Sequence, residues 1–445
     1  MAGLQYGYGG SCSAPVNAFL GDMKRVLMVT YYFPPIGGPA VYPMLKFCKY
    51  LPQHGWLPAV ICGGKNDPDF SSDETLVKEI PEEVEVRRVD YPHGTIWRQV
   101  RGWLFAHRLG RIGHHVGFFI DFPCRFREWA ELAIAEAAHL IEESRPDVIW
   151  TSSPVLSAHY VGLAIKQRFG IPWVADFRDP WVGNPILLSE EHFPQWQLGR
   201  QAGAEAKVAR ESDCCTFAHP LVAQEFAQRH RLPQGKAVPI TCGYDPEDFS
   251  EKTTQNPPEG RLLIVHTGSF YGEYSPKPLY NALKTTVSRK PALLKRLKLV
   301  FVGGCNVDFD FDGLEVEVLP RVSHSEAIAW MQRSDVQMVI LTRTMGNYSI
   351  ASKLFDYLAA ERPILAIVPG QGSCAEIVRK TKSGLVADPD SPEEIIGVLE
   401  TLIKMKAEQA LRFDADSSEV RKFSYPVLSQ TMAKLFDECV GMRRA

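Results

Sequence analysis

Short runs of β-branched and other apolar residues alternate with longer amphipathic stretches from Lys24 to the C-terminal region. This alternation is typical of βαβ units, in which helices connect the strands of a parallel sheet. It predicts an α/β protein with doubly wound, Rossmann-like domains. The expected strands lie at residues 26–30, 59–62, 84–89, 148–151, 173–176 and 214–217, and then at 262–267, 299–302, 316–319, 336–341, 364–368 and 385–387.

A polar, proline-rich stretch at residues 251–260 separates the two groups of strands and has no apolar period. We interpret it as a linker between an N-terminal domain at 23–250 and a C-terminal domain at 261–425. Residues 426–445 are expected to form a closing helix, because apolar side chains recur there at helical spacing. Periodicity leaves open whether this helix packs on its own domain or on the N-terminal one.

Composition narrows the class of protein. The chain has 445 residues, 45% hydrophobic and 23% charged, which suits two globular domains. A formal net charge of -3 provides no general field for nucleic acid, so nucleic acid is not an expected partner. The ten cysteines show no CxxC or Cys/His spacing, which favours reduced thiols in a cytoplasmic protein.

The ends of the chain and its apolar runs bear on targeting. Residues 1–22 lack both a basic start and a long apolar run, so we expect a disordered leader rather than a signal peptide. No stretch reaches the about 18 consecutive apolar residues that a membrane-spanning helix needs. The sequence therefore predicts no helix that crosses a bilayer.

The first candidate functional feature is a Gly37-Gly38 loop between the first expected strand and the helix that follows it. Unpaired N–H groups and the positive end of a helix dipole suit a phosphate, and glycines allow it to approach closely. A diphosphate is the ligand that this pattern favours. The alternative is a tight turn with no ligand.

The second feature is Asp176-Phe177-Arg178-Asp179-Pro180-Trp181, which begins at the end of an expected strand. Ligands of open α/β sheets bind beyond the carboxyl ends of strands, so charged and aromatic side chains at this place indicate a site. The alternative is an Asp–Arg pair that only fixes a loop.

The third feature is the segment from Ser352 to Ala360, which follows the expected strand 336–341. Ser352 resembles a helix N-cap, Lys353 adds a positive charge in the first turn, and Asp356 is placed to accept hydrogen bonds from ribose hydroxyls. The alternative is a capped amphipathic helix in which Asp356 only satisfies the helix end.

With these features in order, the chain from Lys24 onward resembles the family-4 retaining glycosyltransferases of the GT-B fold, in which two Rossmann-like domains face each other across a cleft. The interdomain Gly243-Tyr244-Asp245 with Phe249 and the strand end His266-Thr267-Gly268-Ser269 also match. The resemblance implies a nucleotide-sugar donor as substrate, no cofactor and no metal ion. The residues it implies for the donor are Gly37 and Gly38 beside the diphosphate, Gly268 as a further donor-binding residue, Arg321 and Val322 beside the base, Ser352, Lys353 and Asp356 at the helix start, and Lys277 as a cation for the leaving diphosphate.

Two positions depart from the family pattern. Tyr348 occupies the place of the first acid in the family's paired-glutamate motif, and Arg178 stands where many relatives have a histidine. Arg178 and Asp179 would then orient the acceptor or support the sugar.

Two other functions remain open. A nucleotide-sugar 2-epimerase would need acid/base groups, for which Arg178, Asp179, His159 and His266 are the candidates, and a non-catalytic nucleotide-sugar-binding protein is consistent with Tyr348.

The segment 97–119 combines Arg98, Arg101, Arg108 and Arg111 with aromatic residues and contains no acidic residue. Such a segment suits an anionic membrane surface, where lipid-linked acceptors of polysaccharide biosynthesis lie. A peripheral position at the inner face of the membrane is one expectation. A solvated helix packed on the domain and an acceptor-site loop are the alternatives, and glycan and small-molecule acceptors stay open.

Overall fold

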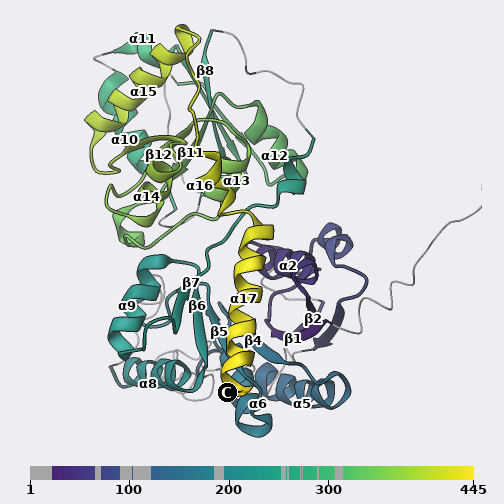
Figure 1. Cartoon of the computed structure of the whole chain (residues 1–445). Coiled ribbons are helices and arrows are strands. Elements are labelled where there is room, and N and C mark those ends of the chain that lie inside the picture. The colour runs from purple at the N-terminus through teal and green to yellow at the C-terminus, as the bar shows by residue number, and fades with distance from the viewer. Residues whose placement is uncertain are drawn as a thin grey trace, which may run out of the picture.

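The structure is a computed structural model of the chain (Figure 1), and it describes residues 23–65, 72–90, 103, 122–184, 195–251, 257, 260–270, 272, 274–287, 290–305 and 314–444. The expected leader at 1–22 and most of the expected linker at 251–260 lie outside the described residues, as does 97–119 except Trp103. The described residues form two parallel β-sheets, each covered by helices on both faces.

The first sheet has seven parallel strands in the order β3-β2-β1-β4-β5-β6-β7. Leu27 of β1 lies opposite Ile149 of β4, which fixes the register at the middle of the sheet. The central strands are continuous apolar runs because both faces of the sheet are buried. The strands are β1 (Lys24–Val29), β2 (Trp56–Gly63), β3 (Glu85–Val89), β4 (Val148–Ser152), β5 (Trp173–Phe177), β6 (Cys214–Phe217) and β7 (Ala237–Pro239).

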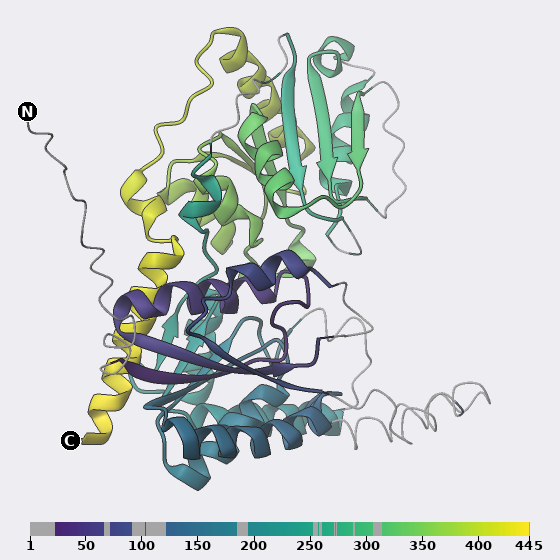
Figure 2. The same cartoon turned by 90° about the vertical axis from the view of Figure 1, so that its right-hand side faces the viewer.

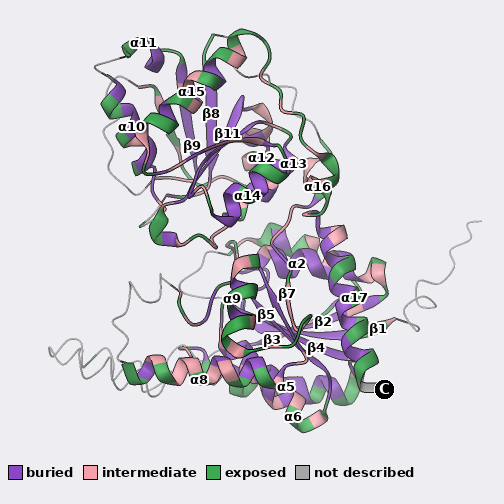
Figure 3. Cartoon of the chain, turned by 60° about the vertical axis from the view of Figure 1, so that its left-hand side comes forward, coloured by how far each residue is buried: buried purple, intermediate pink, exposed green. Residues whose placement is uncertain are grey.

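Helices cover both faces of this sheet, and Figure 3 shows their buried residues in purple. Helices α5, α6, α8 and α9 pack on one face, around Leu27, Trp173 and Phe217. Helices α2 and α17 pack on the other face, around Met28 and Trp150. The bounds are α2 (Val41–Tyr50), η1 (Leu51–His54), η2 (Glu74–Glu79), α5 (Arg127–Ser144), α6 (Ser157–Phe169), α8 (Gln195–Glu211), α9 (Pro220–His230), η3 (Pro246–Phe249) and α17 (Tyr425–Arg444).

The second sheet has six parallel strands in the order β10-β9-β8-β11-β12-β13. Helices α10 and α15 bury one face, and α13 and α14 bury the other. A capping box between Ser323 and Glu326 fixes the start of α12. The elements are β8 (Leu262–Thr267), α10 (Lys277–Val287), α11 (Pro291–Leu294), β9 (Leu297–Val302), β10 (Val316–Leu319), α12 (His324–Arg333), β11 (Val336–Ile340), η4 (Arg343–Met345), α13 (Lys353–Ala359), β12 (Ile364–Ile367), α14 (Ser373–Lys380), β13 (Gly384–Ala387), α15 (Pro392–Ala407) and α16 (Ser417–Arg421).

The closing helix α17 returns to the first domain and runs along it, as Figures 1 and 2 show. The Phe436 ring lies 5.1 Å from the Trp56 ring and 5.7 Å from the Trp150 ring. The chain crosses between the domains at two places, a first crossing around Tyr244 and a second around Phe423. The two crossings are bonded to each other, because the Tyr244 N–H donates to the Phe423 carbonyl at 3.0 Å. The question that periodicity left open is therefore answered: the helix packs on the N-terminal domain.

The architecture confirms the expected pair of doubly wound domains, and each of the twelve expected strands is present. Strand β7 was not predicted. It has three residues at the edge of the first sheet, and none of them is buried, so its apolar pattern is too short to identify.

Candidate functional site

Two glycines shape the carboxyl edge of the second sheet. Gly268 follows β8 with a φ of +112°, and Gly303 follows β9 with a φ of +123°. A Cβ on Gly303 would lie 2.8 to 3.1 Å from the Gly268 backbone, and a Cβ on Gly268 would collide with Lys353 Nζ. The absence of side chains at both positions lets the lysine from α13 reach this edge.

Lys353 is the first residue of α13, and its ammonium lies at the end of β8. Nζ donates to His266 Nε2 at 3.1 Å, while His266 Nδ1 lies 2.9 Å from the Met338 carbonyl. A carbonyl only accepts, so Nδ1 carries the proton and Nε2 is the acceptor. Burial and the charge of Lys353 hold the pKa of His266 well below its usual value. Burial also lowers the pKa of Lys353 to about 8, although Asp356 opposes this.

Asp356 lies one turn further along α13. Burial raises its pKa to about 7, although His324, Lys46 and Lys353 oppose the rise, and the nearby Asp248 adds to it. No hydrogen bond from the described part of the chain reaches the Asp356 carboxylate. A carboxyl that titrates near neutrality and accepts no hydrogen bond within the described residues is available to accept hydrogen bonds from hydroxyls.

Ser352 occupies the N-cap position of α13 but does not cap the helix with its side chain. Its backbone is helical, with φ -55° and ψ -36°, and its hydroxyl makes no capping hydrogen bond. The expected capping role is therefore wrong, because an N-cap side chain needs an extended backbone to reach the first free N–H groups. Ser352 is exposed, and its hydroxyl does not cap the helix.

The first domain contributes α2 to the same site. The Tyr42 ring lies 5.3 Å from the ring of His324 in α12. Burial raises the pKa of Tyr42 to about 12, and the charges of Asp73, Arg321 and Asp356 also act on it. The Gly37-Gly38 loop leads directly into α2, with Gly38 at a φ of +113°, so this loop lies on the same side of the first domain as Tyr42.

A buried ion network joins α2 to the interdomain crossing. Lys46 Nζ lies 2.8 Å from Asp245 Oδ2 and 3.2 Å from Asp248 Oδ2. Tyr50 donates to Asp245 at 2.5 Å, and His324 lies 3.0 Å from Asp248. Burial acts to raise the pKa of Asp245, but Lys46 and its other donors hold it at about 2. The network connects the first domain, the crossing and the second domain through side chains.

The Asp176–Trp181 segment divides between structural and exposed residues. Asp176 is fully buried and accepts hydrogen bonds from hydroxyls of β4 and β6 at 2.7 Å each. Arg178 is 8% exposed, and its guanidinium donates to the Ile240 carbonyl at 3.3 Å and to Cys242 Sγ at 2.9 Å. The structure therefore favours the alternative for these two residues, because Arg178 Nη1 lies 3.6 Å from Asp176 Oδ1 and the guanidinium holds the segment that follows β7. Asp179 alone is exposed.

Comparison with protein families identifies the chain. A model described as Glycosyl transferase 4-like domain matches residues 37–243, and one described as Glycosyl transferases group 1 matches residues 261–405. The chain belongs to the family-4 glycosyltransferases. The two matched segments correspond to its two domains.

Solved structures with the same GT-B architecture resemble this glycosyltransferase over nearly its whole length. Sucrose-phosphate synthase from Thermosynechococcus elongatus is 14% identical, with 94% of this chain and 100% of that chain covered and a TM-score of 0.62. HepE from Anabaena, in complex with UDP and glucose, is 15% identical with 93% and 99% covered and a TM-score of 0.59. The UDP-forming trehalose-phosphate synthase from Burkholderia xenovorans, in complex with glucose-6-phosphate, is 12% identical with 93% and 100% covered and a TM-score of 0.62. No curated protein sequence matches the glycosyltransferase significantly.

Tyr348, at the position of the family's first acid, reaches from the second domain to the first. Its ring lies 5.5 Å from the His219 ring, and it lines a cavity of about 40 Å³ together with Phe177, Trp181 and Phe226. Burial, helped by the charge of Asp179, raises the pKa of Tyr348 to about 12. The glycosyltransferase thus has an aromatic contact between its domains where the family pattern has a carboxylate.

Three other predicted donor residues, Lys277, Arg321 and Val322, have fewer contacts that connect them to the site. Lys277 is exposed at the start of α10, and its backbone N–H donates to Ser275 Oγ at 3.2 Å. No contact within the described residues joins it to Lys353. Arg321 is exposed after β10, and Val322 packs beside a small apolar cluster on the second sheet. Their roles remain predictions.

The two histidines weighed for an epimerase are both neutral and buried. His159 Nδ1 lies 2.9 Å from Thr151 Oγ1, and burial lowers the pKa of this ring to about 3. The His159 ring packs against Phe177 at 4.7 Å. His266 is held by Lys353, as described above. Neither ring is arranged to exchange protons with a sugar.

The sequence reasoning missed His324, Asp248 and Tyr42. His324 follows the capping Ser323, so the helix start itself was a usable signal that a ring stands beside the end of β10. Asp248 lies between the matched Asp245 and Phe249. For Tyr42 no local signal exists, because it reads as one residue on the face of an amphipathic helix.

The described ranges contain neither a candidate metal-ion cluster nor a membrane-spanning helix. There, no group of three or more His, Cys, Asp or Glu side chains is placed to hold a metal ion. None of the helices in those ranges is long and apolar enough to span a membrane.

Proposed function

We propose that this glycosyltransferase moves a sugar from a nucleotide-sugar donor to an acceptor, with retention of anomeric configuration and without a metal ion or cofactor. The observation that supports this most is the pair on the first turn of α13. Lys353 has a pKa of about 8 and Asp356 a pKa of about 7, and the amine is bonded to a neutral ring rather than to an acid. A nucleoside diphosphate offers an anion to the first group and ribose hydroxyls to the second.

The donor would span the two domains. Lys353 and the Gly37-Gly38 backbone would bind the diphosphate, and Asp356 would accept hydrogen bonds from the ribose. The backbone near Arg321 and Val322 would lie beside the base, and the missing side chain of Gly268 leaves room for the lysine. The complex of HepE with UDP and glucose supports a donor of this class by analogy.

Negative charge grows on the leaving diphosphate as the bond to the anomeric carbon breaks. Groups already aimed at that charge stabilise the transition state, and removing one typically costs about 3 to 4 kcal/mol. Lys353, the glycine loop and Lys277 are the groups we propose for this role. Arg178 would act only indirectly, by fixing the crossing segment against the first domain.

The acceptor would lie on the first-domain side, where Asp179 is exposed and its charge acts on Tyr348. The trehalose-phosphate synthase complex with glucose-6-phosphate supports a sugar acceptor by analogy. A glycan and a lipid-linked sugar are the alternative acceptors. Asp179 would orient the acceptor hydroxyl.

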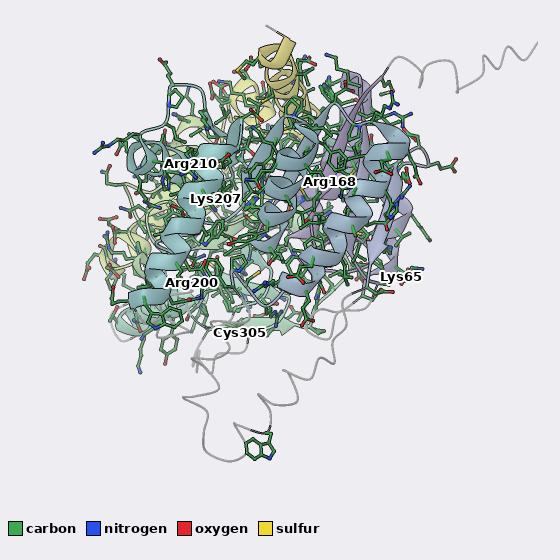
Figure 4. The ribbon with its side chains drawn as sticks, turned by 90° about the horizontal axis from the view of Figure 1, so that it is seen from below. Lys65, Arg168, Arg200, Lys207, Arg210 and Cys305 are labelled. Carbon is green, nitrogen blue, oxygen red and sulfur yellow. The ribbon has the colours of Figure 1, made fainter. Side chains whose placement is uncertain are left out.

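A peripheral membrane position is proposed on the composition of 97–119, which lies outside the described residues except for the exposed Trp103. The described part of the first domain adds Arg200, Lys207 and Arg210 along α8 (Figure 4). The neighbouring α6 adds the exposed Arg168 (Figure 4), whereas α5, on the far side of α6, exposes glutamates. Flotation with anionic and with neutral vesicles tests the proposal, and equal recovery with both would contradict it.

Incubation with labelled UDP-, GDP- and ADP-hexoses tests the donor reaction. Transfer or donor hydrolysis supports the proposal, whereas an epimerised sugar supports a 2-epimerase. Binding without turnover supports a nucleotide-sugar-binding protein, which Tyr348 at the first-acid position favours. Lys353→Met is expected to abolish most turnover, and His139→Gln, on the exposed side of α5, is the matched control.

A further inference from the structure

His324 lies where three parts of the molecule meet. It is the first residue of α12 in the second domain, and its Nε2 lies 3.0 Å from Asp248 Oδ2 on the crossing segment. The Tyr42 ring of α2 in the first domain lies 5.3 Å from it. One imidazole therefore contacts both the crossing and the first domain beside the proposed donor site.

Its surroundings favour the charged ring. Burial acts to lower the pKa of His324, and Lys46 adds to that, but the hydrogen bond with Asp248 and the charges of Asp356 and Asp248 raise it. Of the two carboxyls beside it, Asp248 is bonded to the ring and Asp356 is not. The positive charge of the His324 ring is hydrogen-bonded to Asp248, but it also acts through space on Asp356.

The other cations near Asp356 also have bonded partners, as His324 does. Lys46 Nζ contacts Asp245 at 2.8 Å and Glu79 at 2.6 Å, in addition to Asp248. Lys353 Nζ is bonded to the ring of His266. Arg321 and Tyr42 also face this region, and Tyr42 carries no charge because its pKa is raised to about 12. Of the three cations that lower the pKa of Asp356, His324 has the largest effect, ahead of Lys46 and Lys353.

We propose that His324 is a positioning residue for the donor: its imidazolium, aligned by Asp248, keeps Asp356 ionised so that the carboxylate accepts both ribose hydroxyls of a ribonucleoside diphosphate. This inference rests on the proposed nucleotide-sugar function. An ionised carboxylate only accepts, and its hydrogen bonds are roughly twice as strong as those of a neutral acid. The ribose diol is therefore bound by a carboxylate whose charge depends on a residue of another helix.

The test compares nucleotide affinity at two pH values. Binding of UDP, GDP and ADP is measured by calorimetry at pH 7 and pH 9 for the wild type and His324→Gln, with His139→Gln as the matched control. Glutamine retains a donor for Asp248 but has no charge. A rise of one unit in the pKa of Asp356 reduces its ionised fraction at pH 7 about fivefold, so affinity should fall about fivefold there. At pH 9 the carboxyl is ionised in both proteins, and the affinities should converge.

Three further results decide the matter. His324→Lys, which restores a cation, should bind at pH 7 within about twofold of the wild type, and His324→Gln should cause no further loss in an Asp356→Asn background. If His324→Gln does not fold, His324→Asn replaces it. Equal weakening at both pH values would overturn the inference, because a structural role does not depend on pH. If affinity is lost in Asp356→Asn but unchanged in His324→Gln, the role of His324 is overturned and the proposed function is not. If the wild type binds none of the three nucleotides, both are overturned.

Discussion

Lys353 Nζ and His266 Nε2 lie 3.1 Å apart, and the Met338 carbonyl fixes the tautomer that makes the ring an acceptor. A neutral ring satisfies one hydrogen of the ammonium but does not compensate its charge. Burial therefore lowers the pKa of Lys353 to about 8, close to physiological pH. An anion that binds here would stabilise the charged form, so anion binding and proton uptake are coupled.

The first prediction is that donor binding takes up a proton above about pH 8. Free Lys353 is partly neutral there, whereas the diphosphate favours the ammonium, so affinity should fall as pH rises through the free pKa. Calorimetry of UDP, GDP and ADP at pH 8.5, in buffers with different ionisation enthalpies, measures the uptake. Lys353→Met should remove it. The same uptake in that variant would assign the proton to another group.

The second prediction uses two glycines with similar backbone strain. Gly268 and Gly304 both have left-handed φ values, +112° and +90°, but only a Cβ on Gly268 would collide with Lys353 Nζ, since nothing lies within 4 Å of one on Gly304. Alanine at either site should cost on the order of 1 kcal/mol in stability. Gly268→Ala should in addition weaken nucleotide binding by about tenfold or more, because the amine must move. Calorimetry and thermal melting separate the two effects, and equal loss of binding in both variants would point to backbone strain instead.

Local patterns predicted the strands and the sheet-edge positions well. Buried parallel strands require apolar runs such as Val26–Val29, and parallel topology then places the residues that follow each strand at one edge. Gly268 and Lys353 were both predicted as donor-binding residues, and Lys353 Nζ occupies the space that a side chain on Gly268 would take. The charge and position of Arg178 predicted a site residue, but its guanidinium donates to the Ile240 carbonyl, directly after β7. This contact joins residues far apart in the sequence, so no local pattern predicted it.

The contacts between the domains could not be predicted in the same way. Tyr42 and His324 each occupy a helix face that reads as ordinary amphipathic surface, and their pairing depends on how two separately folded sheets dock. The same holds for Lys46, which reads as a solvated residue of α2 but is 2% exposed between carboxylates. Periodicity describes each element within its own domain and carries no information on such docking.

The third prediction concerns the proposed donor contacts. Asp356→Ala and Lys277→Ala should each remove most donor turnover while the fold is retained, because one loses the ribose acceptor and the other a cation for the leaving group. Turnover of the preferred nucleotide sugar and circular dichroism measure the two properties. Undiminished sugar transfer in both variants would discard this site. Loss in Asp356→Ala alone would limit the donor site to α13, since Lys277 is exposed on α10.

The last prediction concerns the buried network around Lys46. Its pair with Asp245 is almost fully buried, at 2% and 0% exposed side chain, so Lys46→Met should leave an incompletely compensated carboxylate and destabilise the protein by about 3 kcal/mol. Lys24→Met is the control, because the Lys24–Asp437 pair is 45% and 49% exposed and should change stability little.

The pH dependence of the stability lost in Lys46→Met shows whether the loss comes from the charge of the lysine. Lys46 and the other donors lower the pKa of Asp245 in the fold from 3.8 to about 2, so its contribution is complete above about pH 4 and is lost as pH falls through that range. The difference in melting temperature between wild type and Lys46→Met should accordingly narrow between pH 7 and pH 3, while other carboxyls affect both proteins alike. A gap of constant size would show that the lysine acts through the packing of its alkyl chain rather than through its charge.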